Sequence, residues 1–212
     1  SGTGPYKYDG YEQGSAIWLT ANDAWWNRAP QVRYIRASIY GTADQALNAF
    51  DTQSVDIAMT RSINASRYSG SLNTFSLNAR TRQLEVLLVN RAYKDFKSDD
   101  NGQNLLRQAI AYAINRSELI SSAYQNMATV AYTPIPSGTW LSNESAIRDI
   151  YDPLMAASLL DSAGYKLADD GNRYKDGKKM EKLRILVYDE PGSTARTNAA
   201  NKIVDQLAAV GI

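Results

Sequence analysis

The feature that most constrains this fold is the absence of both cysteine and histidine from all 212 residues. Without thiols there are no disulfides, and without either residue type there is no zinc site of the usual kind. The chain must therefore be held together by a hydrophobic core, and its length is sufficient to bury one. The same absence removes thiolate nucleophiles and every mechanism that needs imidazole as a base.

The charge balance gives no preference for a polyanionic partner. The formal net charge is +1, and basic clusters such as residues 176–184 are interleaved with acidic residues. We therefore expect neither nucleic acid nor an anionic membrane surface as a partner. No run approaches the 18 consecutive apolar residues that suggest a transmembrane helix. No stretch resembles a signal peptide, and the first residues have the character of the middle of a fold.

Capping residues and helical periodicity predict five helices. Thr42 with Gln45 forms a capping box before a helix over 43–50. A helix from about residue 105 leads to a second one that Asn115 caps. Asp152 as N-cap and Gly164 as the C′ residue bound a helix of about ten residues. The last helix starts near residue 194 and stops before Gly211.

Short apolar runs between these helices predict strands, and the order strand, helix, strand favours an α/β architecture. The expected strands cover 17–19, 32–40, 54–59, 82–90 and 182–188, and two Asp-Gly turns predict a hairpin over 169–179. Asp9-Gly10 and Gln13-Gly14 are turn signals near the N-terminus. Residues 63–77 and 132–138 are expected to be loops, and 99–103 a turn.

The search for chemistry leaves no catalytic, metal or cofactor candidate. The acidic cluster at 169–172 lacks the spacing and the final glutamate of a calcium loop, so a solvated hairpin explains it better. The glycines at 2–4 precede no helix and lack the lysine of a phosphate loop. The chain is rich in Trp and Tyr, and Trp140, beside the Pro-rich loop, is the best aromatic candidate for a ligand contact.

A series of motifs nevertheless resembles one family in the right order. "GTGPYKYDGYEQGSAIWLTANDAWW" resembles the turn, strands and Asn-x-x-Trp of the family 5 extracellular solute-binding proteins of peptide-type ABC transporters. "ADQALNAFDTQSVDIAM", "EVLLVN", "LLRQAIAYAINRSELI", "YTPIPSG" and "YDPLMAASLLDSAGY" follow in the family's order. The hairpin "DGNRYKDGKK" and "KLRILVY" complete a series that covers nearly the whole chain.

The resemblance implies an α/β fold of the type II periplasmic-binding-protein kind, in the peptide-binding subclass, with two lobes that are incomplete at both ends. Residues 1–82 would be part of the first lobe and residues 83–212 part of the second. Upstream strands with a lipoprotein or secretion signal, and later segments that grip the ligand's amino end, would lie outside this chain. The loop over 97–104 is longer than the usual family turn.

The resemblance also implies the positions that face the interlobe cleft. Met59, Thr60 and Arg61 follow the "VDIA" run, and Gln83 and Val86 lie on the run that crosses between the lobes. Domain interfaces are favoured ligand sites, and strand ends there offer backbone groups to an extended peptide. Each of these five residues could equally be an ordinary strand-end residue.

The implied function is capture of extracellular peptides, or similar small solutes, for an ABC importer. The partners would be the ligand and the membrane permease subunits, with no cofactor and no enzymatic activity, and the full protein would be lipid-anchored outside the cytoplasm. Two alternatives stay open: a ligand-sensing domain of a transcriptional regulator with the same fold, and a hydrolase, against which the missing histidine counts. Oligosaccharides, nickel chelates and opines are alternative ligands within the family.

Overall fold

The computed structural model describes residues 2–97, 103–143, 151–188, 190 and 192–212. These form two compact units, one reaching to Ser62 and the other running from Ile63 to Ile212, and each is described by itself. The turn predicted over 99–103 lies outside the described residues except for Gln103.

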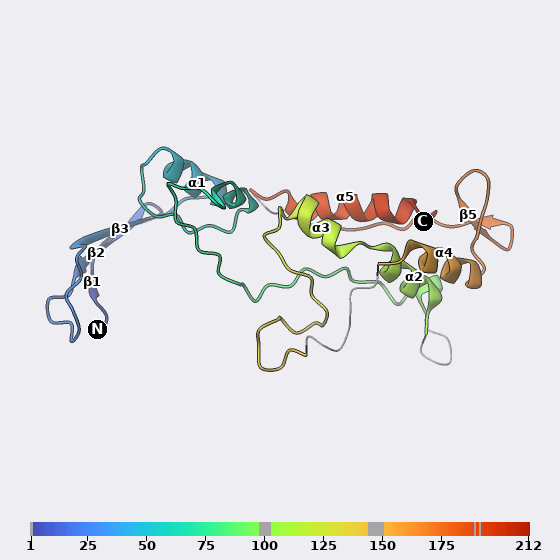
Figure 1. Cartoon of the computed structure of the whole chain (residues 1–212), viewed down its shortest axis with the longest axis horizontal. Coiled ribbons are helices and arrows are strands. Elements are labelled where there is room, and N and C mark those ends of the chain that lie inside the picture. The colour runs from blue at the N-terminus through green and yellow to red at the C-terminus, as the bar shows by residue number, and fades with distance from the viewer. Residues whose placement is uncertain (1, 98–102, 144–150, 189, 191) are drawn as a thin grey trace. The chain divides into compact units, whose positions relative to one another are not determined.

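The first unit contains a three-stranded antiparallel sheet in the order β1 (Tyr6–Glu12), β2 (Ala16–Ala21) and β3 (Tyr34–Ser38) (Figure 1). Gln13-Gly14 makes the predicted turn between β1 and β2, and Gly14 has φ +72°. The turn predicted at Asp9-Gly10 was wrong: both residues lie inside β1, where the pairing register with β2 shifts between Tyr8 and Gly10. A β-bulge absorbs the extra residue there without ending the strand.

Helix α1 (Ala43–Asp51) follows the sheet and begins at the predicted capping box. The Thr42 hydroxyl accepts a hydrogen bond from the Gln45 backbone N–H at 3.2 Å, and the Gln45 side chain accepts one from the Thr42 N–H at 3.1 Å. These two bonds satisfy backbone donors that the first helical turn leaves free. Leu47 and Ala49 are the buried residues of the helix.

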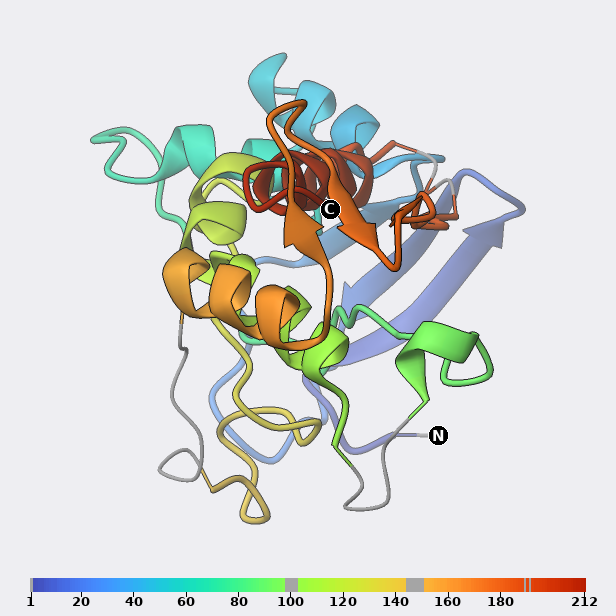
Figure 2. The ribbon, with the colours of Figure 1, turned by 90° about the vertical axis from the view of Figure 1, so that its right-hand side faces the viewer.

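The second unit is built on four helices: α2 (Leu105–Ala113), α3 (Arg116–Ala123), α4 (Pro153–Ser162) and α5 (Ala195–Ala208). Helix α4 packs along α2, and α5 contacts α3, as Figures 1 and 2 show. Two short 3-10 helices, η1 (Ile63–Tyr68) and η2 (Lys94–Phe96), precede them, η1 lying within the predicted loop 63–77. No helix in the described ranges combines the length and the apolar character needed to cross a membrane.

One hydrophobic core lies between α2, α4 and α5. The apolar face predicted for α2 supplies much of it, because positions three and four apart lie on the same side of a helix. The buried residues are Phe96, Leu106, Ala109, Ile110, Ala113, Ile114, Ala156, Leu160, Tyr165, Leu207 and Val210. This core takes the place of disulfides or metals as the source of stability.

The predicted helix boundaries of the second unit are confirmed. Asn115 accepts from the Glu118 N–H at 3.0 Å, and Asp152 accepts from the Met155 N–H at 2.9 Å. Gly164 has φ +88°, a left-handed conformation that glycine adopts without the steric cost of a side chain. Asn104 caps α2 in the same way, although the sequence pattern had not singled it out.

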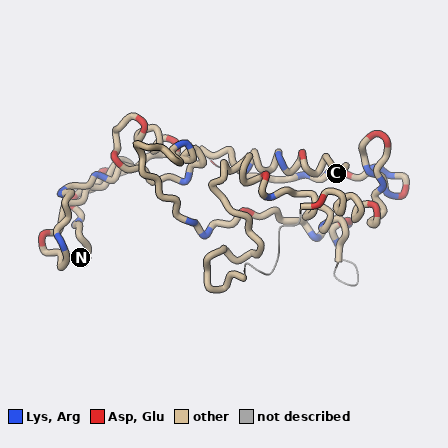
Figure 3. Tube along the Cα trace, in the orientation of Figure 1, with Lys and Arg blue, Asp and Glu red and all other residues tan. Residues whose placement is uncertain are grey.

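The predicted hairpin is confirmed as a small antiparallel sheet of β4 (Lys166–Leu167), β5 (Arg173–Lys175) and β6 (Lys178–Lys179). Both acidic and basic residues occur along it (Figure 3), as expected for a solvated surface. Arg173 is the exception, because it is only 2% exposed. Its Nε donates to the Val210 carbonyl at 2.6 Å and its Nη1 to the Tyr165 carbonyl and Asp161 carboxylate, both at 2.8 Å.

Three predicted strands were wrong as assignments of secondary structure. Residues 54–59, 82–90 and 182–188 belong to no strand of the described residues. A strand exists only when its backbone pairs with a neighbour, whereas the sequence pattern reports only the apolar, β-branched character of the run. The described strand pairs are consequently all antiparallel.

Candidate functional site

The first group of predicted site residues lies at the end of the first unit, beside the start of α1. The Thr60 hydroxyl donates to the Ala43 carbonyl at 3.3 Å and accepts from the Ser62 N–H at 3.0 Å. Thr60 thus fixes the segment to α1. Met59 is 93% exposed and Arg61 is also exposed, so both side chains are accessible for contacts with another molecule.

The second group, Gln83 and Val86, lies in the second unit on the segment 82–90. Glu85, one of the two residues between them, is bound to the first turn of α5. Arg196 donates from Nε to Glu85 Oε2 at 3.0 Å and from Nη2 to Glu85 Oε1 at 2.6 Å. This paired geometry is the strongest form of a carboxylate–arginine contact, and it holds the segment against α5.

Arg196 also contacts a second segment, through Tyr188 and Glu190. Its guanidinium lies 3.9 Å from the centre of the Tyr188 ring, and its Nη1 lies 3.1 Å from Glu190 Oε2. The hydrogen bonds to Glu85 raise the pKa of Arg196, so the side chain stays charged at any physiological pH. One cation therefore organises the segments 82–90 and 182–188 beside α5.

Both predicted residues of this segment are accessible. Gln83 and Val86 are exposed, Val86 to 58%. Their neighbours Leu84 and Val89 are half-buried, and Val89 packs against the core.

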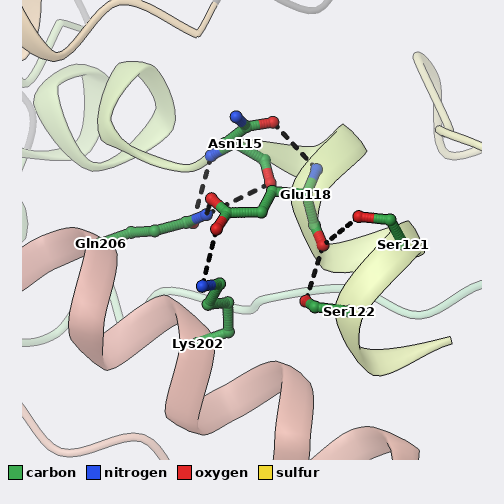
Figure 4. A network of polar contacts seen from close by, with 6 residues as sticks. All are labelled: Asn115, Glu118, Ser121, Ser122, Lys202 and Gln206. Atoms are coloured by element: carbon green, nitrogen blue, oxygen red, sulfur yellow. Dashed lines mark hydrogen bonds and ion pairs between the residues drawn. The ribbon is translucent and has the colours of Figure 1, made fainter. Parts of the chain in front are cut away.

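A polar network ties α3 to α5 close to this position (Figure 4). The Gln206 side chain accepts from the Asn115 backbone N–H at 3.1 Å and donates to Glu118 Oε2 at 2.8 Å. Lys202 Nζ lies 2.6 Å from Glu118 Oε1. The hydrogen bond from Lys202, followed by that from Gln206, holds the pKa of the Glu118 carboxyl below its usual value.

Each unit has a concavity lined by described residues. A cavity of about 520 Å³ in the first unit lies between the chain at 39–41 and α1. A cavity of about 330 Å³ in the second unit lies between Arg80 and the loop 129–142. Sequence reasoning missed both as sites, although it identified the Pro-rich loop beside the second one. Trp140 on that loop is 91% exposed.

No group of three or more His, Cys, Asp or Glu side chains within the described ranges is arranged to hold a metal ion. In the hairpin, Asp170 accepts hydrogen bonds from neighbouring residues: from the Asn172 N–H at 2.9 Å and from the Tyr174 hydroxyl at 2.9 Å.

Comparison with known proteins gives the family. Residues 1–212 match the family described as bacterial extracellular solute-binding proteins, family 5 middle, and the chain belongs to it. A relative, the heme-binding protein A of Haemophilus influenzae, is 27% identical over 168 residues, which are 77% of this chain and 29% of the relative. The dipeptide-binding protein of Escherichia coli is 27% identical over 165 residues, or 77% of this chain and 30% of that protein.

The solved structures give the fold. NikA from Brucella suis, in complex with Fe(III)-EDTA, superposes with a TM-score of 0.76 at 24% identity, over 100% of this chain and 42% of NikA. The predicted fold class is confirmed as that of the type II periplasmic binding proteins, peptide-binding subclass. The chain spans about 30% of the length of the two relatives.

Proposed function

We propose that this chain is part of the solute-binding component of an ABC importer. The observation that carries the proposal is the family match over all 212 residues. The relatives are named as binding proteins, which accords with a chain that lacks cysteine and histidine. The full protein would work outside the cytoplasm, held by a lipid anchor, and deliver its ligand to permease subunits in the membrane.

Peptides are the ligand class we propose, because a dipeptide-binding protein is among the relatives over three quarters of the chain. The names of other relatives favour a second class. The Haemophilus influenzae relative is named for heme, and the NikA structure contains Fe(III)-EDTA. Both ligands are iron chelates with carboxylate groups. Both ligand classes carry carboxylate groups.

The lobe assignment stays part of the proposal. Residues 1–82 would belong to the first lobe and 83–212 to the second, with Met59, Thr60, Arg61, Gln83 and Val86 facing the ligand. Hinge closure of two lobes over a solute would bury it between them. The exposed side chains of Met59 and Val86 support this, because an accessible apolar surface is what a ligand can cover.

Native mass spectrometry of the full-length protein tests the proposal. The protein is mixed with a pool of short peptides, and in parallel with heme and with a ferric chelate. Retention of peptides supports the proposed ligand class, and retention of chelates alone moves the assignment to the second class. Failure to retain any of the three would sink both ligand classes and favour oligosaccharides, nickel chelates or opines as ligands, or the regulator alternative.

A further inference from the structure

We propose that Arg80 and the loop 129–142 form a subsite for the carboxylate group of a small solute. The proposal rests on the proposed function and names the chemical group that the second unit recognises. The subsite is the cavity of about 330 Å³ in that unit, which lies at the lower end of the range for small-molecule sites. Its lining residues are Arg80, Thr129, Val130, Ala131, Tyr132, Thr133, Ile135, Ser137 and Ser142.

Arg80 gives the cavity its charge. It is the sole charged residue among the described residues that line it. No ion pair among the described residues uses Arg80. Its guanidinium is thus available to a solute, and a single positive charge matches the single negative charge of a carboxylate.

Hydroxyl groups line the same cavity as this cation. No side-chain hydrogen bond of Thr129, Ser137 or Ser142 to another described residue is found, so the three hydroxyls can donate to a ligand oxygen. A guanidinium presents paired N–H groups that fit the two oxygens of a carboxylate, and neutral hydroxyls add hydrogen bonds without changing the charge balance.

The loop that carries the hydroxyls is held by its own hydrogen bonds. Thr133 Oγ1 donates to the Ile135 carbonyl at 3.1 Å, and Thr139 Oγ1 donates to the Pro136 carbonyl at 3.0 Å. The Ser142 N–H then donates to the Thr139 carbonyl at 3.0 Å. Two prolines restrict the same loop. A loop that is ordered before binding loses less entropy when the ligand arrives.

The loop backbone at Gly138 lies next to Arg80. The φ of Gly138 is +79°, and a Cβ built on it would lie 3.9 Å from Arg80 Nη1. The guanidinium therefore lies against the backbone of the loop. Val130, Ala131 and Ile135 supply an apolar part of the lining for the carbon atoms next to the carboxylate.

The test compares peptides that end in a carboxylate with the same peptides amidated at the C-terminus, using the full-length protein. Wild type should bind the carboxylate form at least tenfold more tightly. Arg80→Gln should abolish this preference while it retains binding of the amide, and Arg80→Lys should restore part of it. Arg82→Gln is the matched control, because Arg82 is an exposed arginine two residues away that does not line the cavity. An undiminished preference in Arg80→Gln overturns the subsite.

A second measurement separates the subsite from the proposed function. N-acetylglycine is titrated while the Arg80 side-chain Nε–H signal is followed by NMR, with N-acetylglycine amide as the control. A saturable shift at Arg80 but not at Arg82 supports the subsite even if wild type retains no peptide. No shift, or equal shifts at both arginines, overturns the subsite even if peptides bind elsewhere.

Discussion

Arg173 shows how a single residue can hold three elements of the second unit together. It lies on β5 and donates to Asp161 of α4, to the Tyr165 carbonyl three residues after α4, and to the Val210 carbonyl after α5. A guanidinium has enough donors in one plane to reach all three acceptors, whereas an ammonium group does not. The hairpin is thereby fixed to the helical core by a polar contact that is almost fully excluded from water.

Replacement of Arg173 should therefore destabilise the second unit. Arg173→Met leaves two main-chain carbonyls without their donor, and we expect a loss of about 2–4 kcal/mol in the free energy of unfolding. Arg173→Lys should recover only a minor part of this loss. Urea denaturation measures both, with the exposed hairpin residue Lys179→Met as a control expected to change stability by less than about 0.5 kcal/mol. Equal effects of Arg173→Met and Lys179→Met would contradict the structural role of the buried arginine.

At the scale of elements, helix α5 organises its surroundings through side chains at both ends. Arg196 in its first turn binds Glu85, and Gln206 near its end binds the junction between α2 and α3. Both contacts join segments far apart in the sequence. The helix thus supports the segment that carries Gln83 and Val86.

Loss of the Arg196 contact should loosen that segment. Arg196→Gln removes the paired hydrogen bonds to Glu85 and the stacking on Tyr188, and we expect a loss of roughly 1–2 kcal/mol. Cleavage by chymotrypsin after the leucines of 83–90 should become faster, while cleavage within α4 stays unchanged. Arg184→Gln, at an exposed arginine on the segment 182–188, is the control and should leave cleavage over 83–90 unaltered. Unchanged cleavage in Arg196→Gln would show that other contacts hold the segment.

The contact between α3 and α5 should be sensitive to acid. The pKa of Glu118 is lowered in the folded state, so the unfolded chain binds a proton more readily. This contribution to stability is complete well above the ordinary value of 4.5 and disappears as the pH falls through the folded-state pKa. In urea unfolding between pH 7 and pH 3, Glu118→Gln should lose less stability on acidification than wild type. Asp169→Asn, at an exposed hairpin turn, is the control, and its stability should change with pH as that of wild type does. If Asp169→Asn loses as little stability on acidification as Glu118→Gln, a specific role of Glu118 is contradicted.

At the scale of the whole molecule, the position of the boundary between the lobes remains a prediction. The compact units of the structure divide at Ser62, whereas the proposed lobes divide after Arg82. The segment 63–82 lies between these points. Its 3-10 helix η1 contains no buried residue, and the hydrophobic core draws its fully buried residues from Phe96 to Val210.

Removal of the segment 63–82 should therefore cost the second unit little. We expect polypeptides 63–212 and 83–212 to have the same free energy of unfolding within about 0.5 kcal/mol, because the segment adds almost no apolar burial. Circular dichroism with urea denaturation compares the two. A shorter polypeptide that is less stable by more than about 1 kcal/mol would move the boundary of the second lobe toward Ile63.

The sequence by itself determined the helices, the N-caps of α1, α3 and α4, the turn at Gln13-Gly14 and the hairpin over 169–179. Caps, helical periodicity and tight turns depend on residues only a few positions apart. Thr42, Asn115, Asp152 and Gly164 each mark a boundary that the structure confirms. Its ordered motifs also gave the family, which the match over the whole chain confirms. The cleft position of residues 59–61, 83 and 86 stays a prediction.

Only the tertiary structure decided which apolar runs pair as strands and which distant side chains meet. The run over 82–90 has the composition of a strand, but pairing depends on a partner backbone that no local pattern specifies. Three contacts join residues that are 37 to 111 positions apart in the sequence. They are those of Arg196 with Glu85, of Arg173 with Val210, and of Arg80 with the loop at Gly138. Such contacts follow from packing of the complete core, and for that reason the Arg80 cavity could not be predicted from the sequence.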